Sequence, residues 1–181
     1  MEMATLLALM ETPEPAHMTM KPRAGTLPVG EVSAAVDRIY SHSEASERTR
    51  QLAKAALLLW HDQVEAAHEI VQDMENPDAA LLHGILHRRE LDFSNARYWF
   101  HRVGAHQSFD CVVGKVKVVL LTSVADIVAM QIVPQDKWHP LPFVDVLETH
   151  GRRNEPSVDM LLRQIQRAEI QCFLESLPSR G

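Results

Sequence analysis

The sequence predicts an all-α protein, built from antiparallel helical hairpins and closed on one side by a long C-terminal helix. Three observations lead to this class. Apolar residues recur at helical spacing along most of the chain, and glycine is sparse, with 7 in 181 residues. The one valine-rich stretch with strand character, 111–121, has no second strand candidate to pair with its backbone. We therefore expect helix over 109–133.

The composition indicates one compact domain with tails. Apolar residues make up 46% and charged residues 23% of the chain, which is typical of a globular protein of this size. The net charge of −6 argues against nucleic acid as a partner. Polar and charged residues interrupt the most apolar segment, 116–133, so no membrane span is expected.

The N-terminus and the cysteines bear on where the protein resides. The short apolar run 3–10 is flanked by glutamates and follows no basic residue, so we do not expect a signal peptide. Cys111 and Cys172 each lie in an apolar helical pattern and form no C-x-x-C pair. We expect two buried free thiols and a cytoplasmic protein.

The chain divides into an arm, a helical domain and a tail. Residues 1–29 contain four prolines and no sustained period, so this arm either wraps the domain or is disordered. The single helical domain is expected over 30–176, followed by a short tail, 177–181. The amphipathic pattern of 156–174 predicts the long helix that packs along the body of the domain.

Two consecutive hairpins are expected in the middle of the chain. Ser46 is a plausible N-cap for a helix over 47–60, and Asp62 for the helix after it. Asn76-Pro77-Asp78 ends that helix and begins another, because proline is accepted only in a first turn. Asp92 or Ser94 caps the fourth helix of the set, which Gly104 ends.

Two resemblances follow from the second hairpin. Gly84, Ala96 and Phe100 reproduce the small, small, aromatic spacing of a tetratricopeptide repeat, although the early tryptophan and the downstream proline are missing. The chain also carries H-R-R-E at 87–90, N-A-R-Y-W-F-H-R-V-G at 95–104 and W-H-P-L-P-F-V-D at 138–145. In these motifs it resembles an uncharacterised family of bacterial and fungal proteins, with His101 where arginine is usual. The resemblance implies a grouping and no activity.

Six of the ten histidines lie between His61 and His106. His83, His87 and Glu90 stand at i, i+4 and i+7, so their side chains share roughly one face of a helix. Two imidazoles and a carboxylate suit a divalent metal such as zinc, iron or manganese, and His61 or Asp62 at the facing corner could complete the set. The competing interpretation is that these histidines border the core, as His68 is expected to do.

A basic and aromatic pocket is the second candidate site. A carboxylate or phosphate could be held by the cationic side chains of this stretch, with Tyr98 or Trp99 as the apolar wall; these are Arg88, Arg89, Arg97 and Arg102, together with His87 and His101. The competing interpretation is that Arg88 or Arg89 pairs with Glu90, Asp92 or a distant acid and bridges the hairpins. The residues of this predicted ligand site are His83, His87, Arg88, Glu90, Tyr98, Trp99 and Arg102.

We expect a non-catalytic binding or scaffold module whose pocket takes a protein segment or a small anionic ligand. The alternative is a metal-dependent hydrolase or oxidoreductase that uses the histidine and glutamate cluster. An exposed Tyr98 or Trp99 would also suit a homodimer interface.

Overall fold

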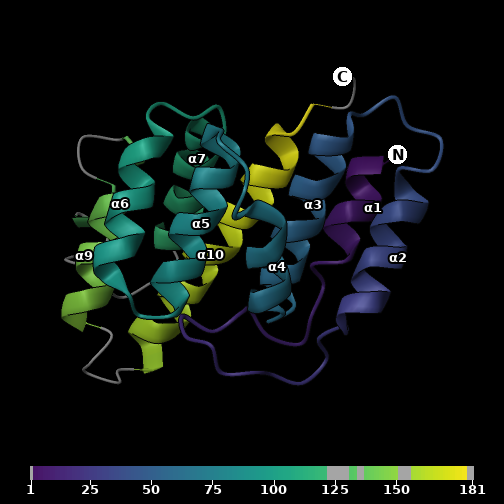
Figure 1. The fold of residues 1–181 in the computed structure, drawn as a ribbon. Coiled ribbons are helices and arrows are strands. Elements are labelled where there is room, and N and C mark those ends of the chain that lie inside the picture. Colours follow the sequence, from purple (N-terminus) through teal and green to yellow (C-terminus); the bar gives the residue numbers. More distant parts are fainter. Residues whose placement is uncertain (1, 122–130, 134–136, 151–155, 179–181) are drawn as a thin grey trace.

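Nine helices and no strand are found in the part of the chain that the computed structural model describes, residues 2–121, 131–133, 137–150 and 156–178 (Figure 1). The prediction of an all-α fold is confirmed. The helices are α1 (Glu2–Ala8), α2 (Val29–Ile39), α3 (Glu47–Trp60), α4 (Val64–Val71), α5 (Pro77–Arg89), α6 (Phe93–Val103), α7 (Phe109–Leu121), α9 (Pro140–His150) and α10 (Pro156–Ser176). None of them is long and apolar enough to cross a membrane. The helix predicted over 109–133 is present up to Leu121, and residues 122–130 lie outside the described part.

The hairpins form where local capping signals predicted them. The side chain of Ser46 accepts a hydrogen bond from the Thr49 amide at 3.1 Å. Asn76 and Asp92 do the same at the starts of α5 and α6, at 2.9 and 3.1 Å. Helices α3 and α4 pack as one hairpin, and α5 and α6 as the next.

Gly84 allows α5 and α6 to approach closely. A Cβ atom at this position would lie 2.2 Å from Cε1 of Phe100, whose side chain is fully buried. We expect Gly84→Ala to lower the free energy of unfolding by about 1–3 kcal/mol through overpacking. Urea denaturation measures this loss.

Gly114 provides the matched control, because it also lies within a helix and its Cβ would meet nothing within 4 Å. Gly114→Ala should be neutral or stabilising by up to about 1 kcal/mol, the difference in helix propensity. Equal effects of the two substitutions would show that the contact with Phe100 is not what requires glycine.

The long C-terminal helix was predicted correctly. Helix α10 passes behind α5 and α3 in Figure 1 and packs against α1, α3 and α7. Its apolar face buries Leu161, Leu162 and Ile165 in the first half and Ile170 and Phe173 in the second. It therefore joins the N-terminal and central helices into one core.

The N-terminal arm is part of that core. Leu6, Met10, Ala16 and Met18 are each at most 3% exposed. Backbone carbonyl groups of this irregular stretch accept hydrogen bonds from polar side chains of the helices. Gln166 of α10, for example, donates to the carbonyl oxygens of Ala16 and His17 at 3.2 Å. At the other end of the chain Leu177 is buried as well, while 179–181 lie outside the described residues.

Asp62 does not cap α4, and that prediction was wrong. The cap position belongs to Gln63, whose side chain makes no capping bond. Asp62 has a positive φ of 62°, and its buried carboxylate accepts hydrogen bonds from Arg23 at 3.1 Å and from Arg89 at 2.7 Å. Arg89 also donates to the backbone carbonyl of Thr19 at 3.1 Å. The carboxylate thus ties the N-terminal arm to the end of α5.

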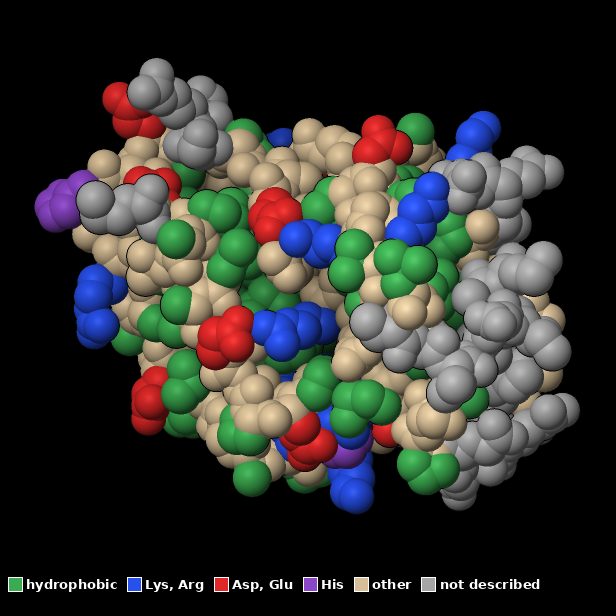
Figure 2. Space-filling view, turned by 180° about the vertical axis from the view of Figure 1, so that it is seen from behind, with side chains coloured by type: hydrophobic (Ala, Val, Ile, Leu, Met, Phe, Trp, Pro, Cys, Tyr) green, Lys and Arg blue, Asp and Glu red, His purple; other side chains and the backbone are tan. Residues whose placement is uncertain are grey.

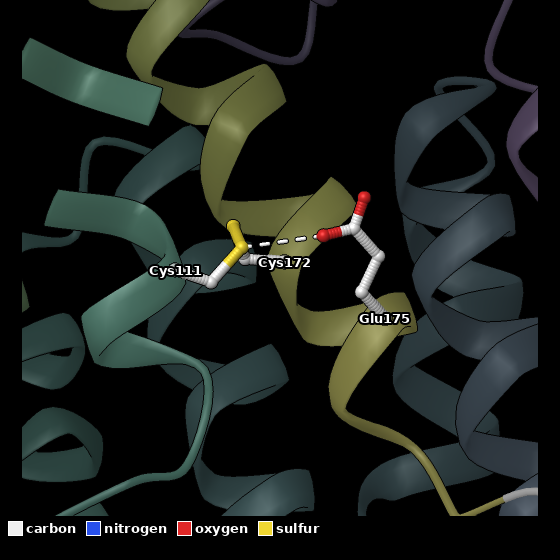
Figure 3. Close-up of side chains that lie close together, drawn as sticks. All are labelled: Cys111, Cys172 and Glu175. Carbon is white, nitrogen blue, oxygen red and sulfur yellow. Dashed lines mark hydrogen bonds between the residues drawn. A yellow bond between two sulfur atoms is a disulfide. The ribbon is translucent and has the colours of Figure 1, made fainter. Parts of the chain in front are cut away.

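The prediction of two free thiols was also wrong. Cys111 of α7 and Cys172 of α10 form a disulfide, with Cα atoms 5.7 Å apart (Figure 3). The Cys172 side chain is buried and Cys111 is half-buried. Disulfides persist mainly in oxidising compartments, so this bond does not favour the cytoplasmic location, which stays a prediction.

Charges of both signs are mixed on the face opposite to that of Figure 1. Figure 2 shows basic side chains next to acidic ones on this face, and apolar side chains around these charged groups. Arg97 of α6 forms ion pairs with Asp145 and Glu148 of α9, at 2.7 and 2.6 Å. Mixed charge of this kind is typical of a solvated protein surface.

Candidate functional site

Helix α5 is buried on every side from Ala79 to Arg89. A helix in this position must satisfy its polar side chains with partners from several directions. Successive residues of a helix diverge by about 100°, so His83 and His87 share one side while Arg88 and Arg89 point to others. The predicted site residues on α5 are therefore separated into different environments.

His83 and His87 meet a third histidine, His68 of α4. The ring centroid of His68 lies 5.2 Å from that of His83 and 5.7 Å from that of His87. The centroids of His83 and His87 are 6.0 Å apart. Trp99 of α6 stacks on His83 with its ring centroid at 4.0 Å and the two planes nearly parallel. We refer to His68, His83 and His87 as the histidine cluster.

The environment of His83 keeps its imidazole neutral at physiological pH. Burial, together with the neighbouring His68 and His87, lowers its pKa to about 4, and the carbonyl of Ala79 opposes this shift only in part. Its Nδ1 atom is buried and makes no well-formed hydrogen bond. The buried ring is therefore a neutral imidazole, with one N–H group and one nitrogen lone pair.

His87 is oriented by two polar neighbours. Its Nδ1 atom lies 2.7 Å from a carboxylate oxygen of Glu90. The side-chain amide of Asn95 lies 3.2 Å from the other ring nitrogen, Nε2. The carboxylate favours a proton on Nδ1, which leaves Nε2 with its lone pair.

His61 stands apart from this cluster. It is 1% exposed, and its Nδ1 atom accepts a hydrogen bond from the amide of Leu27 at 3.2 Å, which holds the N-terminal arm. Burial lowers its pKa. Of the predicted metal set, His87 contacts Glu90 and lies beside His83, while His68 and not His61 is the third histidine of the cluster. No three ligand atoms of these residues lie within 4.8 Å of one another.

His68 is the site residue that sequence reasoning missed. The apolar stripe of its helix favoured a core histidine, yet its side chain is only half-buried and its ring packs on two other imidazoles. The signal available in the sequence was its place on the inner face of a helix that pairs with α5. That position predicts which helix packs against His68, but it does not predict which side chains of that helix lie next to it.

Arg88 lies on a different side of α5 from His83 and His87. It is fully buried and forms an ion pair with Glu169 of α10, with Oε2 at 2.5 Å and Oε1 at 3.1 Å. Its guanidinium group also lies 4.2 Å from the ring centroid of Phe143. Burial raises the pKa of Glu169, and the charge of Arg88 lowers it again. This arginine holds helices together and is not placed to receive a ligand.

Tyr98, Trp99 and Arg102 line a surface groove beside the corner between α4 and α5. The groove has a volume of about 640 Å³, and we refer to it as the α6 groove. Its lining residues are Gln72, Met74, Glu75, Asn76, Pro77, Ala80, Tyr98, Trp99 and Arg102. Tyr98 is 55% exposed, which is unusual for so large a ring. Three of the predicted ligand residues therefore lie together.

Arg102 has a distinctive position at this groove. Its guanidinium carbon lies 5.7 Å from the ring centroid of Tyr98 and 5.6 Å from that of Trp99. Among the residues that the structure describes, no carboxylate lies within ion-pair distance of it. Its one side-chain hydrogen bond within the same residues is a long one, 3.5 Å, to the Tyr98 hydroxyl. A ligand carboxylate would meet an arginine that no carboxylate of the described residues neutralises.

The disulfide lies beside a carboxylate, and together they form a group of metal-ligating residue types. Within the described ranges, only Cys111, Cys172 and Glu175 bring three such atoms within 4.8 Å of one another. Figure 3 shows the carboxylate of Glu175 pointing at the sulfur of Cys111, at 3.2 Å. Because the two sulfurs are bonded to each other, neither is a thiolate, and the group is not a metal site in this state.

Comparisons with models of protein families, with curated proteins and with solved structures found no match for this chain.

Proposed function

We propose that this protein is a non-catalytic binding module whose α6 groove takes a segment of another protein. The observation that carries the proposal is Arg102, a cation without a carboxylate partner among the described residues, set over two aromatic rings at the edge of the groove. Arginine and aromatic side chains contribute most of the binding energy in many protein interfaces. The guanidinium group of an arginine can also donate two parallel hydrogen bonds to one carboxylate.

The openness of the site favours a protein segment over a small molecule. Small-molecule pockets usually bury most of the ligand, about 70–90% of its surface. Here Tyr98 and Arg102 stand exposed on one side, and Gln72, Glu75 and Pro77 are exposed on the other. An extended chain can lie across such a groove while much of it still faces solvent.

The charges of the groove specify the kind of segment. Arg102 would receive one acidic side chain, and the exposed Glu75 on the opposite rim disfavours a second acid beside it. Met74, Pro77 and the Trp99 ring offer apolar surface in the same groove. We therefore expect a segment with one acidic residue, a large apolar residue and a basic or amide residue in sequence.

Selection from a random peptide display library on the purified full chain tests the proposal. We expect enrichment of peptides with this order of residues, and loss of that enrichment in Arg102→Glu, because the charge that receives the acid is reversed. The control is Arg48→Glu, at an exposed arginine near the start of α3 that does not line the groove. Enrichment that survives Arg102→Glu, or no enrichment at all, would contradict the proposal.

A further inference from the structure

The carboxylate of Glu175 lies against the disulfide in a contact that the disulfide itself does not require. Its Oε2 atom is 3.2 Å from Sγ of Cys111 (Figure 3). A cysteine sulfur in a disulfide has no S–H group, so it donates no hydrogen bond to this oxygen. The contact becomes favourable only in another state of the two cysteines, in which the sulfurs carry protons or share a cation with the carboxylate.

The other oxygen of the Glu175 carboxylate is held from two sides. Gln171, one turn earlier on α10, donates to Oε1 at 2.8 Å, and Nζ of Lys115 on α7 lies 3.3 Å from the same oxygen. These two contacts orient the carboxylate and leave Oε2 facing Cys111. Outer partners of this kind are typical of carboxylates that bind metals.

The three candidate ligand atoms already lie close to one point. Both Sγ atoms and a carboxylate oxygen of Glu175 are within 4.8 Å of one another. In tetrahedral zinc sites with zinc–sulfur bonds of about 2.3 Å, a bound sulfur and oxygen lie roughly 3.6 Å apart, and two bound sulfurs roughly 3.8 Å. The Cys111 sulfur and the Glu175 oxygen are 3.2 Å apart. Two sulfurs that are no longer bonded separate to van der Waals contact, which is close to the spacing that zinc needs.

We propose that, once the disulfide is reduced, Cys111, Cys172 and Glu175 bind one divalent transition metal of the zinc class. Soft thiolates select such metals, whereas magnesium and calcium prefer ligands that are all oxygen. The divalent ion and Lys115 together balance the charges of the two thiolates and the carboxylate. Cys111 is half-buried and Glu175 is exposed, so solvent reaches this side of the group and a water can complete the coordination.

A dithiol reductant opens the site by thiol–disulfide exchange. Its thiolate attacks Sγ of Cys111, the more accessible sulfur, and the electron pair of the broken sulfur–sulfur bond leaves on Cys172. The second thiolate of the reductant then displaces Cys111 from the mixed disulfide and closes the reductant's own disulfide. The reductant loses two electrons, which the two cysteines gain. Protons that the cysteines take up are released when their thiolates bind the metal.

This site shares no residue with the α6 groove. The proposal does not depend on the proposed function, since it needs no peptide. Its test uses metal alone, so its failure would leave the binding-module proposal standing, and the reverse also holds. Because the disulfide and the metal exclude each other, the site exists only where thiol reductants keep cysteines reduced.

Titration of the full chain with cobalt(II), whose thiolate complexes absorb in the near ultraviolet, tests the proposal. One sample is reduced with dithiothreitol, which is then removed without air, and the other sample keeps its disulfide. We expect one cobalt per reduced chain, displaced by zinc, and no thiolate absorption from the oxidised chain. Glu175→Gln should weaken binding to the reduced chain by about tenfold or more, since losing even an outer partner of a metal ligand costs that much.

The control is Glu65→Gln, at an exposed glutamate of α4 outside the group, which should leave the affinity unchanged. If reduction alone unfolds the chain, zinc should restore the helical circular dichroism, so the experiment still decides. A reduced chain that neither binds metal stoichiometrically nor refolds with it would overturn the proposal. So would equal binding by the oxidised chain, or an affinity that Glu175→Gln leaves intact.

Discussion

Replacing Arg88 with methionine should lower the free energy of unfolding by about 3–5 kcal/mol. The reason is Glu169, whose carboxylate is only 2% exposed and would remain in the core without its counter-charge. Gln166, the other side-chain partner of Arg88, lies at 3.4 Å and also loses its donor. Urea denaturation at neutral pH measures the loss.

The loss in Arg88→Met should depend on pH in a defined direction. Burial raises the pKa of Glu169 above the ordinary value of 4.5, and Arg88 opposes this shift, so the pKa rises further when Arg88 is removed. The folded variant then binds a proton more readily than the unfolded chain. Its unfolding free energy therefore increases as the pH falls toward 4.5, and the deficit should be smaller near about pH 5 than near about pH 8.

Two controls separate the buried charge from general effects of losing an arginine. Arg97→Met removes two partly exposed ion pairs between α6 and α9 and should cost only about 0–1 kcal/mol for each. The double variant Arg88→Met with Glu169→Leu removes both buried charges, and it should recover much of the stability that Arg88→Met loses. If Arg88→Met were no more destabilised than Arg97→Met, the buried pair would not be a major part of this fold.

Asp62→Asn should also destabilise the protein by about 3–5 kcal/mol, because two buried guanidinium groups then lose their common carboxylate. Asparagine keeps the shape of the side chain and tolerates the positive φ of 62°. The effect therefore isolates the charge. Since Arg23 lies on the N-terminal arm, the substitution should also expose residues 9–28 to limited proteolysis.

The matched control for Asp62→Asn is Asp37→Asn. Asp37 pairs with Lys54 at 2.9 Å, but its side chain is 64% exposed, so the expected cost is about 0–1 kcal/mol. Urea denaturation and proteolysis of both variants make the comparison. Equal stability and equal proteolysis of the two would contradict the role assigned to the Asp62 carboxylate.

The sequence predicted those features of the fold that short-range interactions determine. Ser46, Asn76 and Asp92 each cap a helix by bonding to an amide three residues later, so the signal and its partner are visible together. Gly84 similarly offers room for a close neighbour, and Phe100 of α6 is that neighbour. Tyr98 and Arg102 were expected on one face because they stand at i and i+4, and they do share the groove.

The errors concern residues whose partners are distant in the chain. Asp62 resembles a helix cap, but its partner Arg23 lies 39 residues away. The cysteines are 61 residues apart, and only the packing of α7 on α10 brings them to bonding distance. The sequence left Arg88 open between a ligand pocket and an ion pair with an acid, because its partner Glu169 lies 81 residues away.

The coupling between Arg102 and the acid of a selected peptide is the most direct test of the binding-module account. It requires four dissociation constants: the protein and Arg102→Met, each with the peptide and with its acid-to-amide form. We expect each change alone to weaken binding by about tenfold or more, since a charge-assisted hydrogen bond contributes about 1.5–3 kcal/mol. The second change should then add little to the first. Fully additive effects, or a dissociation constant that Arg102→Met leaves unchanged, would contradict the central claim that this arginine receives a partner's carboxylate.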